Sequence, residues 1–444
     1  MLAPGAVVEL TIEKPAAGGR MLARHEGLVV LVSAAIPGER VRALVERTTA
    51  GVAYAAVVEV IEASADRRPA GDWACGGNVY AHIAYPRQLP LKSAIVLDAL
   101  ARIGHVPHEG PIAVTPSPEH GYRMRARFHV RGSRLGFFRE GTHHLCDPAS
   151  TRQLLPESDR LVGELGEMVA GGRLAGVTSV ELAENVPGTE RALHLELDRP
   201  VSPAGLAGAA ALPTVVGVSA SFTSPAPSRD RLRRSKHPGT NTEARPARRG
   251  TMTHGGAPCV LDELEIEGAR FHLQHHAQAF FQGNRYLLAP LASRVRALVP
   301  RGPVVDLYAG VGLFAATLAA SGWERVVAVE SDRAAAADLR INAAPFGAAL
   351  QPVEVPVEGY LASHPVGRET TIVIDPPRTG MSREASAVLA RQGAGHIVYV
   401  SCDVATFARD ARRLLDGGYR LEHLEAFDLF PNTAHVEAVA LFAR

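Results

Sequence analysis

The stretch VVDLYAGVGLFAATLAASG, residues 304–322, decides the fold of the second half of the chain. It begins as a β-branched apolar run, turns through two glycines and continues as an apolar segment of helical length. Gly310 and Gly312 let the backbone pass close to a ligand at the carboxyl end of the predicted strand. The next predicted strand, RVVAVE, ends in Glu330, an acid that can bind both hydroxyls of a ribose. We therefore predict a nucleotide-type pocket that includes Gly310 and Glu330.

Two classes of ligand fit this pocket. A strand, a glycine turn and a helix with a following acid are shared by dinucleotide-dependent dehydrogenases and by methyltransferases that use S-adenosylmethionine (AdoMet). The pattern from Asp306 to Gly312 is DxxxGxG, which is weaker than the full GxGxxG that cradles a pyrophosphate. The sequence therefore favours AdoMet, which carries no phosphate, and leaves a dinucleotide as the alternative.

Strands and helices alternate from about residue 261 to residue 444. The Val- and Ile-rich runs TTIVID and HIVYVS are followed by the helical segments SREASAVLARQG and DVATFARDARRLLDGG. Buried strands that alternate with amphipathic helices are typical of a parallel, doubly wound sheet. The predicted fold class of residues 261–444 is therefore α/β, in the form of a Rossmann-like AdoMet methyltransferase domain.

Two further strand ends in this half carry chemical groups. TTIVID runs into DPPR, residues 375–378, whose two prolines fix an extended turn that can face a planar base or amide. HIVYVS is followed by Cys402, which the topology places at the same sheet edge as Gly310 and Glu330. We interpret Cys402 as a nucleophile. Its thiol needs activation, for which the N-terminus of the next helix is one source.

The first 260 residues predict two smaller parts. Residues 1–62 contain short β-branched runs between Gly/Pro turns, which indicates a small barrel or sandwich. Residues 63–260 mix helical and strand patterns, so we predict a central α+β domain. In its segment YRMRARFHV, Arg123, Arg125 and Arg127 alternate and project from one face of a strand, which suits contacts with RNA phosphates. A solvated outer face is the alternative.

Residues 223–256 predict a flexible basic loop, because they are rich in Ser, Pro, Gly and Arg and have no apolar period. The positively charged side chains of this loop are Arg229, Arg231, Arg233, Arg234, Lys236, Arg245, Arg248 and Arg249. A basic segment of this kind is attracted to polyanions. It favours a nucleic acid as partner over plain solvation.

The composition excludes several classes of protein. With 444 residues, 46% of them hydrophobic and 21% charged, the chain is globular and has more than one domain. It has neither an apolar run long enough for a membrane helix nor the layout of a signal peptide, so we expect no membrane partner. Four cysteines are too few for a disulfide scaffold, and we expect a reducing, cytoplasmic setting. A net charge of +1 still allows local basic patches.

Six ordered segments resemble the RNA (uracil-C5)-methyltransferases, which make 5-methyluridine in tRNA and ribosomal RNA. These segments are FFQGN (280–284), DLYAG (306–310), ESD (330–332), DPPRTG (375–380), SCD (401–403) and FPNTAHVE (430–437). The N-terminal stretch GGRMLARHEGLVVLVSAAIPGERVRALV resembles a TRAM domain, an RNA-binding, OB-like barrel. The resemblance covers nearly the whole chain and is weakest over residues 185–260.

The resemblance implies a role for individual residues. Cys402 would add to C6 of the uracil, Glu437 would remove the C5 proton as a general base, and Phe280 would stack on the target base. The residues implied to contact AdoMet or the uracil are Gln282, Tyr308, Glu330 and Asp375. Glu358 is expected as a further contact on the adenine side, from its place after the next strand.

The sequence departs from the family where many members bind a 4Fe–4S cluster through C-x5-C-G-G-C and a distant fourth cysteine. Only Cys75 and Cys146 are present here, and Pro69 and Asn78 occupy the first and third positions. Because such a cluster normally needs four thiolates, we predict no intact cluster and no metal. The two cysteines are then remnants that could lie close in space.

The leading hypothesis is a class I, AdoMet-dependent RNA (uracil-C5)-methyltransferase that acts as a monomer. One alternative is a methyltransferase for another base position, either cytosine C5 or an exocyclic amine. A second alternative is a catalytically impaired RNA-binding or RNA-folding factor. The sequence leaves open whether tRNA or ribosomal RNA is the substrate, and which uridine is modified.

Overall fold

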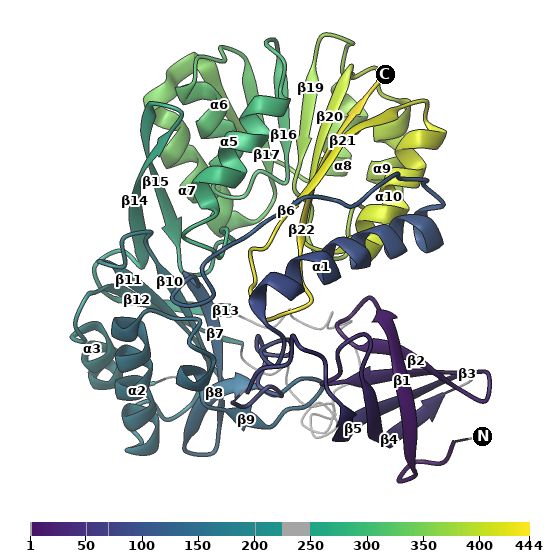
Figure 1. The fold of residues 1–444 in the computed structure, drawn as a ribbon. Helices are drawn as coiled ribbons and strands as arrows, with labels where there is room; N and C mark the ends of the chain where they lie inside the picture. Colours follow the sequence, from purple (N-terminus) through teal and green to yellow (C-terminus); the bar gives the residue numbers. More distant parts are fainter. Residues whose placement is uncertain (1, 50, 70, 200, 224–248) are drawn as a thin grey trace, which may run out of the picture.

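The computed structural model describes residues 1–444 except 1, 50, 70, 200 and 224–248. Three parts meet in it (Figure 1): a purple barrel, a blue-to-teal central domain and a green-to-yellow C-terminal domain that lies above both. Among the described residues, no helix is long and apolar enough to cross a membrane.

Five strands close the N-terminal barrel in the order β1-β2-β3-β5-β4. They are β1 (Val7–Pro15), β2 (Met21–His25), β3 (Leu28–Ser33), β4 (Arg40–Thr49) and β5 (Val52–Glu62). Apolar side chains alternate along the strands and fill the interior, such as Leu10 and Ile12 of β1 and Val41 and Val45 of β4. Closure leaves no free sheet edge. The predicted barrel is confirmed.

The central domain contains a seven-stranded sheet in the order β13-β12-β11-β10-β7-β8-β9. Its strands are β7 (Arg125–Arg131), β8 (Arg134–Phe138), β9 (Leu145–Cys146), β10 (Val177–Glu184), β11 (Arg191–Leu197), β12 (Val215–Thr223) and β13 (Arg249–Gly255). Helices α2 (Pro156–Ala170) and α3 (Pro203–Ala210) contact it and share an apolar core with it. The predicted α+β class of this domain is confirmed.

The structure differs from the predicted flexible loop over residues 223–256 at the two ends that it describes. Residues 249–255 form strand β13, which pairs antiparallel with β12 so that Gly217 lies opposite Gly255. The sequence RGTMTHG of β13 has little apolar character, and it therefore gives no strand signal. It can still form a strand, because an edge strand is held mainly by backbone hydrogen bonds. Residues 224–248, which hold most of the predicted basic side chains, lie outside the described residues.

The C-terminal domain is built on an eight-stranded sheet in the order β18-β17-β16-β19-β20-β22-β21-β6. Its strands are β6 (Val114–Thr115), β16 (Val304–Leu307), β17 (Val326–Glu330), β18 (Leu350–Glu354), β19 (Thr371–Ile374), β20 (His396–Ser401), β21 (Arg420–Phe427) and β22 (Glu437–Ala443). The accompanying helices are α5 (Leu288–Leu298), α6 (Leu313–Ala320), α7 (Arg333–Ala343), α8 (Val357–Ser363), α9 (Arg383–Arg391) and α10 (Val404–Asp416). Strands β16 to β20 run parallel, with apolar clusters on both faces, which confirms the doubly wound fold.

Part of the segment predicted as central domain belongs to the C-terminal sheet. Helix α1 (Tyr85–Ala99) continues into a π-helical turn (Leu100–Gly104), and both contact α10 (Figure 1). Strand β6 pairs parallel with β21 at the sheet edge. Between the two domains, β14 (Cys259–Ile266) and β15 (Ala269–His276) form a separate hairpin. Two short 3-10 helices, Pro148–Thr151 and Ala344–Ala349, complete the elements.

Candidate active site

The glycine turn after β16 has the backbone conformation that its sequence predicts. Gly310 and Gly312 have φ values of 57° and 97°, a region that glycine enters without steric cost. The N–H of Gly310 donates to Oε2 of Glu330 at the end of β17, over 2.8 Å. The other oxygen of Glu330 accepts the next two backbone N–H groups at 2.6 Å each. The side chain of Glu330 therefore lies directly beside the glycine turn, at the edge of the predicted nucleotide-type pocket.

A tyrosine inside this turn is strained. Tyr308 has a φ of 60°, which is rare for a residue with a bulky side chain. Burial raises the pKa of its hydroxyl, and the neighbouring Glu358 adds to this effect. Strained backbone of this kind is retained where the surrounding structure holds it, often at a functional site.

A deeper carboxyl group, that of Asp306, lies beneath the turn. Its Oδ2 accepts the N–H of Ala315 in α6 over 3.1 Å, which ties the strand to the helix. Burial raises the pKa of Asp306 well above its ordinary value, and the charge of Asp375 raises it further. Its Oδ1 is buried and has no hydrogen-bond partner among the described residues.

Asp375 and Gln282 meet at the end of β19. The Nε2 of Gln282 donates to Oδ2 of Asp375 over 2.9 Å, and Gln282 comes from the segment between β15 and α5. Burial raises the pKa of Asp375 to about 7, although this hydrogen bond acts in the opposite direction. Asp375 is therefore poised to take up or release a proton near neutral pH.

Cys402 follows β20 and is partly buried. Desolvation raises the pKa of its thiol to about 12, with smaller contributions from the carboxyl groups of Glu437 and Asp375. Arg378 opposes this shift through its positive charge and a hydrogen bond to the sulfur. The thiol therefore sits between two acids that disfavour the thiolate and one guanidinium that favours it.

Glu437 reaches the same edge because β22 runs antiparallel to its neighbours. Ser401 at the end of β20 lies opposite Ala438, so the first residue of β22 lies beside the carboxyl ends of the parallel strands. Glu437 is buried, and desolvation and the charge of Asp375 raise its pKa well above the ordinary value. A raised pKa makes the carboxylate form of this side chain a stronger base.

A cavity of about 420 Å³ opens at Cys402, and all three domains contribute to its wall. Its lining includes Ala17 and Gly18 from the barrel, Gly76, Arg123, Arg127, His129 and Phe138 from the central domain, and Arg378, Cys402 and His435 from the C-terminal domain. Three arginines therefore face a cavity that also holds a thiol, a combination suited to a polyanionic substrate.

Many curated proteins match this chain, and two of them illustrate the similarity over almost their whole length. The 23S rRNA (uracil(1939)-C(5))-methyltransferase RlmD of Pseudomonas fluorescens is 32% identical over 98% of this chain and 93% of its own. The protein of the same name from Aromatoleum aromaticum is 31% identical over 96% and 97% of the two chains. This chain belongs to the family of RNA (uracil-C5)-methyltransferases.

Family models and a solved structure agree with this assignment. A model described as tRNA (Uracil-5-)-methyltransferase matches residues 367–444, and a TRAM domain model matches residues 2–58. The crystal structure of Pyrococcus abyssi tRNA (uracil-54, C5)-methyltransferase in complex with S-adenosyl-L-homocysteine covers 98% of this chain and 99% of its own, with a TM-score of 0.73 and 22% identity. It shares the fold. The predicted family and the predicted TRAM domain are both confirmed.

AdoMet, the predicted methyl donor, is the cofactor of this RNA (uracil-C5)-methyltransferase family, and the sheet edge suits it. The carboxyl groups of Asp306, Glu330 and Asp375 surround the glycine turn and favour a cationic ligand over a pyrophosphate. The unpartnered buried oxygen of Asp306 lies at the same place. The contacts predicted for Gln282, Tyr308, Gly310, Glu330, Glu358 and Asp375 stay predictions.

Two residues that the family resemblance assigned to ligands stand at the margin of this site. Phe280 is 65% exposed, so its ring is free to meet a base that arrives from outside. Glu358, in the first turn of α8, accepts a hydrogen bond from Ser382 over 2.7 Å and lies near Tyr308. A role for Glu358 on the adenine side stays a prediction.

The three alternating arginines of the central domain divide into two groups. Their side chains are less buried than those of the residues between them, as the alternation predicts. Arg123 and Arg127 line the cavity. Arg125 instead donates to the backbone carbonyls of Ala277 and Ala279, which precede Phe280. Arg125 therefore holds a loop in this structure, and its predicted contact with RNA phosphates stays a prediction.

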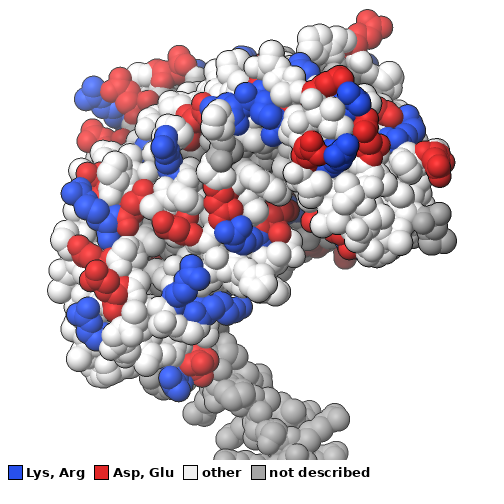
Figure 2. All heavy atoms as spheres, turned by 60° about the horizontal axis from the view of Figure 1, so that its bottom comes forward, with Lys and Arg blue, Asp and Glu red and all other residues white. Residues whose placement is uncertain are grey.

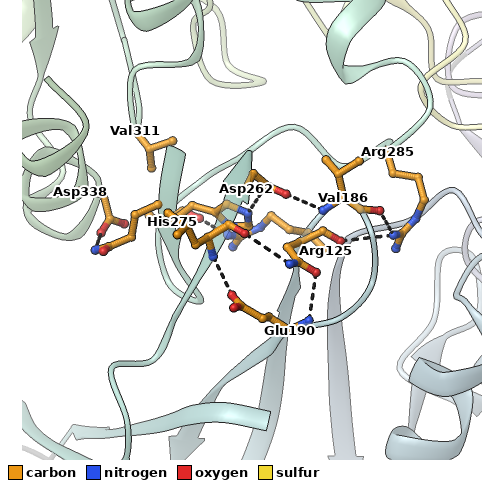
Figure 3. Close-up of polar contacts among 12 residues, drawn as sticks. Arg125, Val186, Glu190, Asp262, His275, Arg285, Val311 and Asp338 are labelled. Atoms are coloured by element: carbon orange, nitrogen blue, oxygen red, sulfur yellow. Dashed lines mark hydrogen bonds and ion pairs between the residues drawn. The ribbon is translucent and has the colours of Figure 1, made fainter. Parts of the chain in front are cut away.

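Figure 3 shows the polar network around this loop. The Nε2–H of His275 donates to Oδ2 of Asp262 over 3.1 Å. The imidazole ring of His275 also stacks on the ring of Phe281, with the two centroids 4.1 Å apart. Asp338 of α7 accepts the N–H of His276 over 2.6 Å. Side chains from the central domain, the β14–β15 hairpin and α7 therefore fix the segment that carries Phe280 and Gln282.

Sequence reasoning missed two other parts of the site. Arg378 belongs to the DPPR motif, but its contact with Cys402 depends on a turn geometry that the motif alone does not give. Lys92 of α1 forms a fully buried ion pair with Asp428 and donates to the carbonyl of Phe430 over 2.9 Å. Nothing near Lys92 in the sequence signals a partner so far along the chain.

The two cluster-type cysteines are joined to each other. Cys75 and Cys146 form a disulfide with a Cα–Cα distance of 5.7 Å, so neither offers a thiolate in this structure. The pairing differs from the expected reducing setting, and it arises because the β8–β9 turn brings the two segments together. Among the described residues, no group of three or more His, Cys, Asp or Glu side chains is placed to hold a metal ion. The predicted lack of a cluster stays a prediction.

Proposed function

We propose that this protein methylates C5 of a uridine in structured RNA, with Cys402 as the nucleophile and Glu437 as the general base. The observation that carries the proposal is the convergence of Cys402, Glu437, Asp375 and Arg378 at one sheet edge, beside the glycine turn. AdoMet, when bound there, supplies a methyl group on a positively charged sulfur.

The chemistry needs both a sulfur and a base. Uracil C5 is a poor nucleophile, and a bond from Sγ of Cys402 to C6 turns C5 into an enolate carbon that can take a methyl group. Glu437 then removes the C5 proton, and the C6–S bond breaks to release the product and the thiolate. Arg378 favours the thiolate through its positive charge and its hydrogen bond to the sulfur.

The proposed substrate is RNA, and the proposed setting is the cytoplasm, with the protein acting as a monomer. The TRAM barrel and the arginines of the cavity support an RNA partner. Two curated relatives, 32% and 31% identical, are named for 23S rRNA, whereas the solved structure named for tRNA is 22% identical. Ribosomal RNA is therefore the first substrate to test, and tRNA the second.

The test is nucleoside mass spectrometry of ribosomal RNA and tRNA from cells that lack the gene, after incubation with the purified protein and AdoMet. We expect 5-methyluridine in one fraction, and none with Cys402→Ala. A 5-methylcytidine or N-methylated product would assign another base. Binding of RNA without any methylated nucleoside would assign an RNA-binding factor instead.

A second test addresses the mechanism. RNA that contains 5-fluorouridine has no C5 proton to lose, so the adduct with Cys402 should persist through denaturing electrophoresis. Methyl transfer without a trapped complex, or a complex with Cys402→Ala, would contradict the proposed C6 addition.

A further inference from the structure

The wall of the cavity contains a stack of planar side chains that the proposed chemistry does not use. The rings of His129 in β7 and Phe138 in β8 are stacked, with centroids 3.8 Å apart and planes 7° from parallel. The guanidinium of Arg131 lies 5.3 Å from the centroid of Phe138. His129 and Phe138 both line the cavity that holds Cys402.

We propose that His129 and Phe138 form a second nucleobase subsite, which stacks a nucleotide next to the target uridine. The inference rests on the proposed function, because it assumes that RNA enters this cavity. Phe280, which is expected to stack on the target base, comes from a different segment and is not among the residues that line the cavity. The stacking site proposed at His129 and Phe138 is therefore separate from the one expected at Phe280.

Three features of the subsite favour a nucleobase over another planar ligand. RNA-binding proteins commonly stack unpaired bases on aromatic rings and on arginine planes, and both are present here. Arg123 and Arg127 line the same cavity and can meet the phosphates on either side of a stacked base. Burial and the charges of Arg127 and Arg131 lower the pKa of His129, which keeps its ring neutral at physiological pH and suited to stacking.

The domain arrangement also favours a neighbouring nucleotide over the target itself. Cys402 and Arg378 follow strands β20 and β19 of the C-terminal sheet, whereas His129 and Phe138 belong to strands β7 and β8 of the central sheet, which lies below the C-terminal domain in Figure 1. A uridine taken out of its stack to reach Cys402 leaves its neighbours without a stacking partner. The ring pair replaces that lost contact.

The contribution of stacking to RNA affinity can be measured separately from that of the charged side chains. On the face shown in Figure 2, Lys/Arg and Asp/Glu side chains are interspersed, and Arg127 itself pairs with Glu196 over 2.6 Å. A stacked ring adds affinity without releasing counterions, whereas an arginine that meets a phosphate adds to the salt dependence of binding. The two kinds of contact can therefore be told apart by titrating salt.

The first experiment measures methylation kinetics with whichever RNA fraction the protein modifies. We expect Phe138→Leu and His129→Leu to raise KM for RNA about tenfold, with KM for AdoMet unchanged, because base–aromatic stacking contributes that order of affinity. Phe138→Trp should restore KM for RNA. Tyr286→Leu is the matched control, since Tyr286 is an exposed ring, 41% accessible, outside the cavity lining.

The second experiment separates stacking from charge. The slope of log Kd for RNA against log salt should be unchanged in Phe138→Leu and should fall by about one in Arg127→Gln. Thermal unfolding of each variant shows whether it is folded. A folded Phe138→Leu with wild-type KM, or with a reduced salt slope like that of Arg127→Gln, would overturn the subsite.

The third experiment locates the contact directly. The same RNA, substituted with 5-iodouridine and bound to the Cys402→Ala protein, is irradiated and the crosslinked tryptic peptides are mapped. We expect crosslinks in peptides 128–131 and 135–139, which hold His129 and Phe138. Crosslinks confined to other peptides would overturn the subsite. Loss of the 5-fluorouridine adduct in the wild-type protein would instead overturn the proposed function.

Discussion

At the scale of single residues, the resting site keeps its nucleophile protonated. Desolvation, Glu437 and Asp375 together raise the pKa of Cys402, and only Arg378 opposes them. Such a thiol resists oxidation and unwanted alkylation, because the thiolate is the reactive form. The thiol of Cys402 must therefore be activated when the substrate binds. Binding would change the balance between Glu437 and Asp375, which disfavour the thiolate, and Arg378, which favours it.

Alkylation of Cys402 in the RNA-free protein should report this balance. Because the pKa is raised to about 12, the thiolate fraction rises about tenfold per pH unit between pH 7 and 9, and labelling by iodoacetamide should follow it without a plateau. Arg378→Gln should slow labelling at every pH, since it removes the group that lowers this pKa. Cys259, whose pKa is raised to about 11, is the internal reference for mass spectrometry. A plateau below pH 9 would contradict the described surroundings of Cys402.

Glu437→Gln should separate the two halves of the reaction. Glutamine keeps the shape of the side chain but cannot take the C5 proton, so the adduct between Cys402 and unsubstituted RNA should accumulate and turnover should fall by at least about a hundredfold. Denaturing electrophoresis with labelled RNA measures the adduct. The double variant with Cys402→Ala is the control and should form none. Rapid turnover by Glu437→Gln would assign the base to another residue.

At the scale of elements, the sequence predicts which residues meet at the edge of the C-terminal sheet, because strand direction determines this. Gly310, Glu330, Asp375 and Cys402 follow parallel strands, so their meeting at one edge could be read from the alternation of strands and helices. Arg125 shows what this reasoning leaves out. Its alternation with Arg123 and Arg127 is correct, but its partners are carbonyls of another segment, and no local pattern identifies them. Docking contacts of this kind depend on tertiary structure.

Helix α1 is the element whose role was least predictable. Lys92 and Asp428 are both fully buried, and Lys92 also donates to the segment that leads into Glu437. Burial lowers the pKa of Lys92, whereas the adjacent Asp428 favours its charged form. The pair therefore fixes α1 against the loop before β22, although a charged pair in an apolar interior is costly to desolvate.

Removing one partner of this pair should be strongly destabilising. We expect Lys92→Met to lower the free energy of unfolding by about 3–5 kcal/mol, because Asp428 is left buried without its counter-ion. The double variant with Asp428→Asn should regain part of the loss. Lys14→Met is the matched control, since Lys14 pairs with Asp98 of the same helix at 2.6 Å but is half exposed, and should cost at most about 1 kcal/mol. Chemical denaturation measures all three variants, and equal effects of Lys92→Met and Lys14→Met would contradict the buried pair.

At the scale of the whole molecule, a covalent link lies close to the cavity. The Cys75–Cys146 disulfide connects the segment that carries Gly76 and Gly77 to strand β9, and both glycines line the cavity. The sequence indicated that these cysteines could lie close together, but spacing alone did not reveal the bond.

Removing this disulfide should loosen the central domain. For a separation of 71 residues, the chain-entropy relation gives about 4 kcal/mol, and measured values are often about 2–4 kcal/mol. We expect the Cys75→Ser, Cys146→Ser double variant to unfold at a lower temperature than the wild type, with Cys259→Ser as the control of nearly unchanged stability. Thiol titration of the unfolded, unreduced protein should find two free thiols of the four cysteines. Four free thiols would show that the bond does not form.

The residues that line the cavity come from distant parts of the sequence, which has a consequence for the newly made protein. Residues that line it range from Ala17 in the first domain to Val436 just before β22, and Glu437 is the first residue of that strand. A chain translated only as far as α10 contains the whole barrel and Cys402. It lacks Glu437 and the part of the cavity wall that follows α10, such as His435 and Val436. Under the proposed mechanism, activity therefore requires β22, which lies between β20 and β21 and begins with the base.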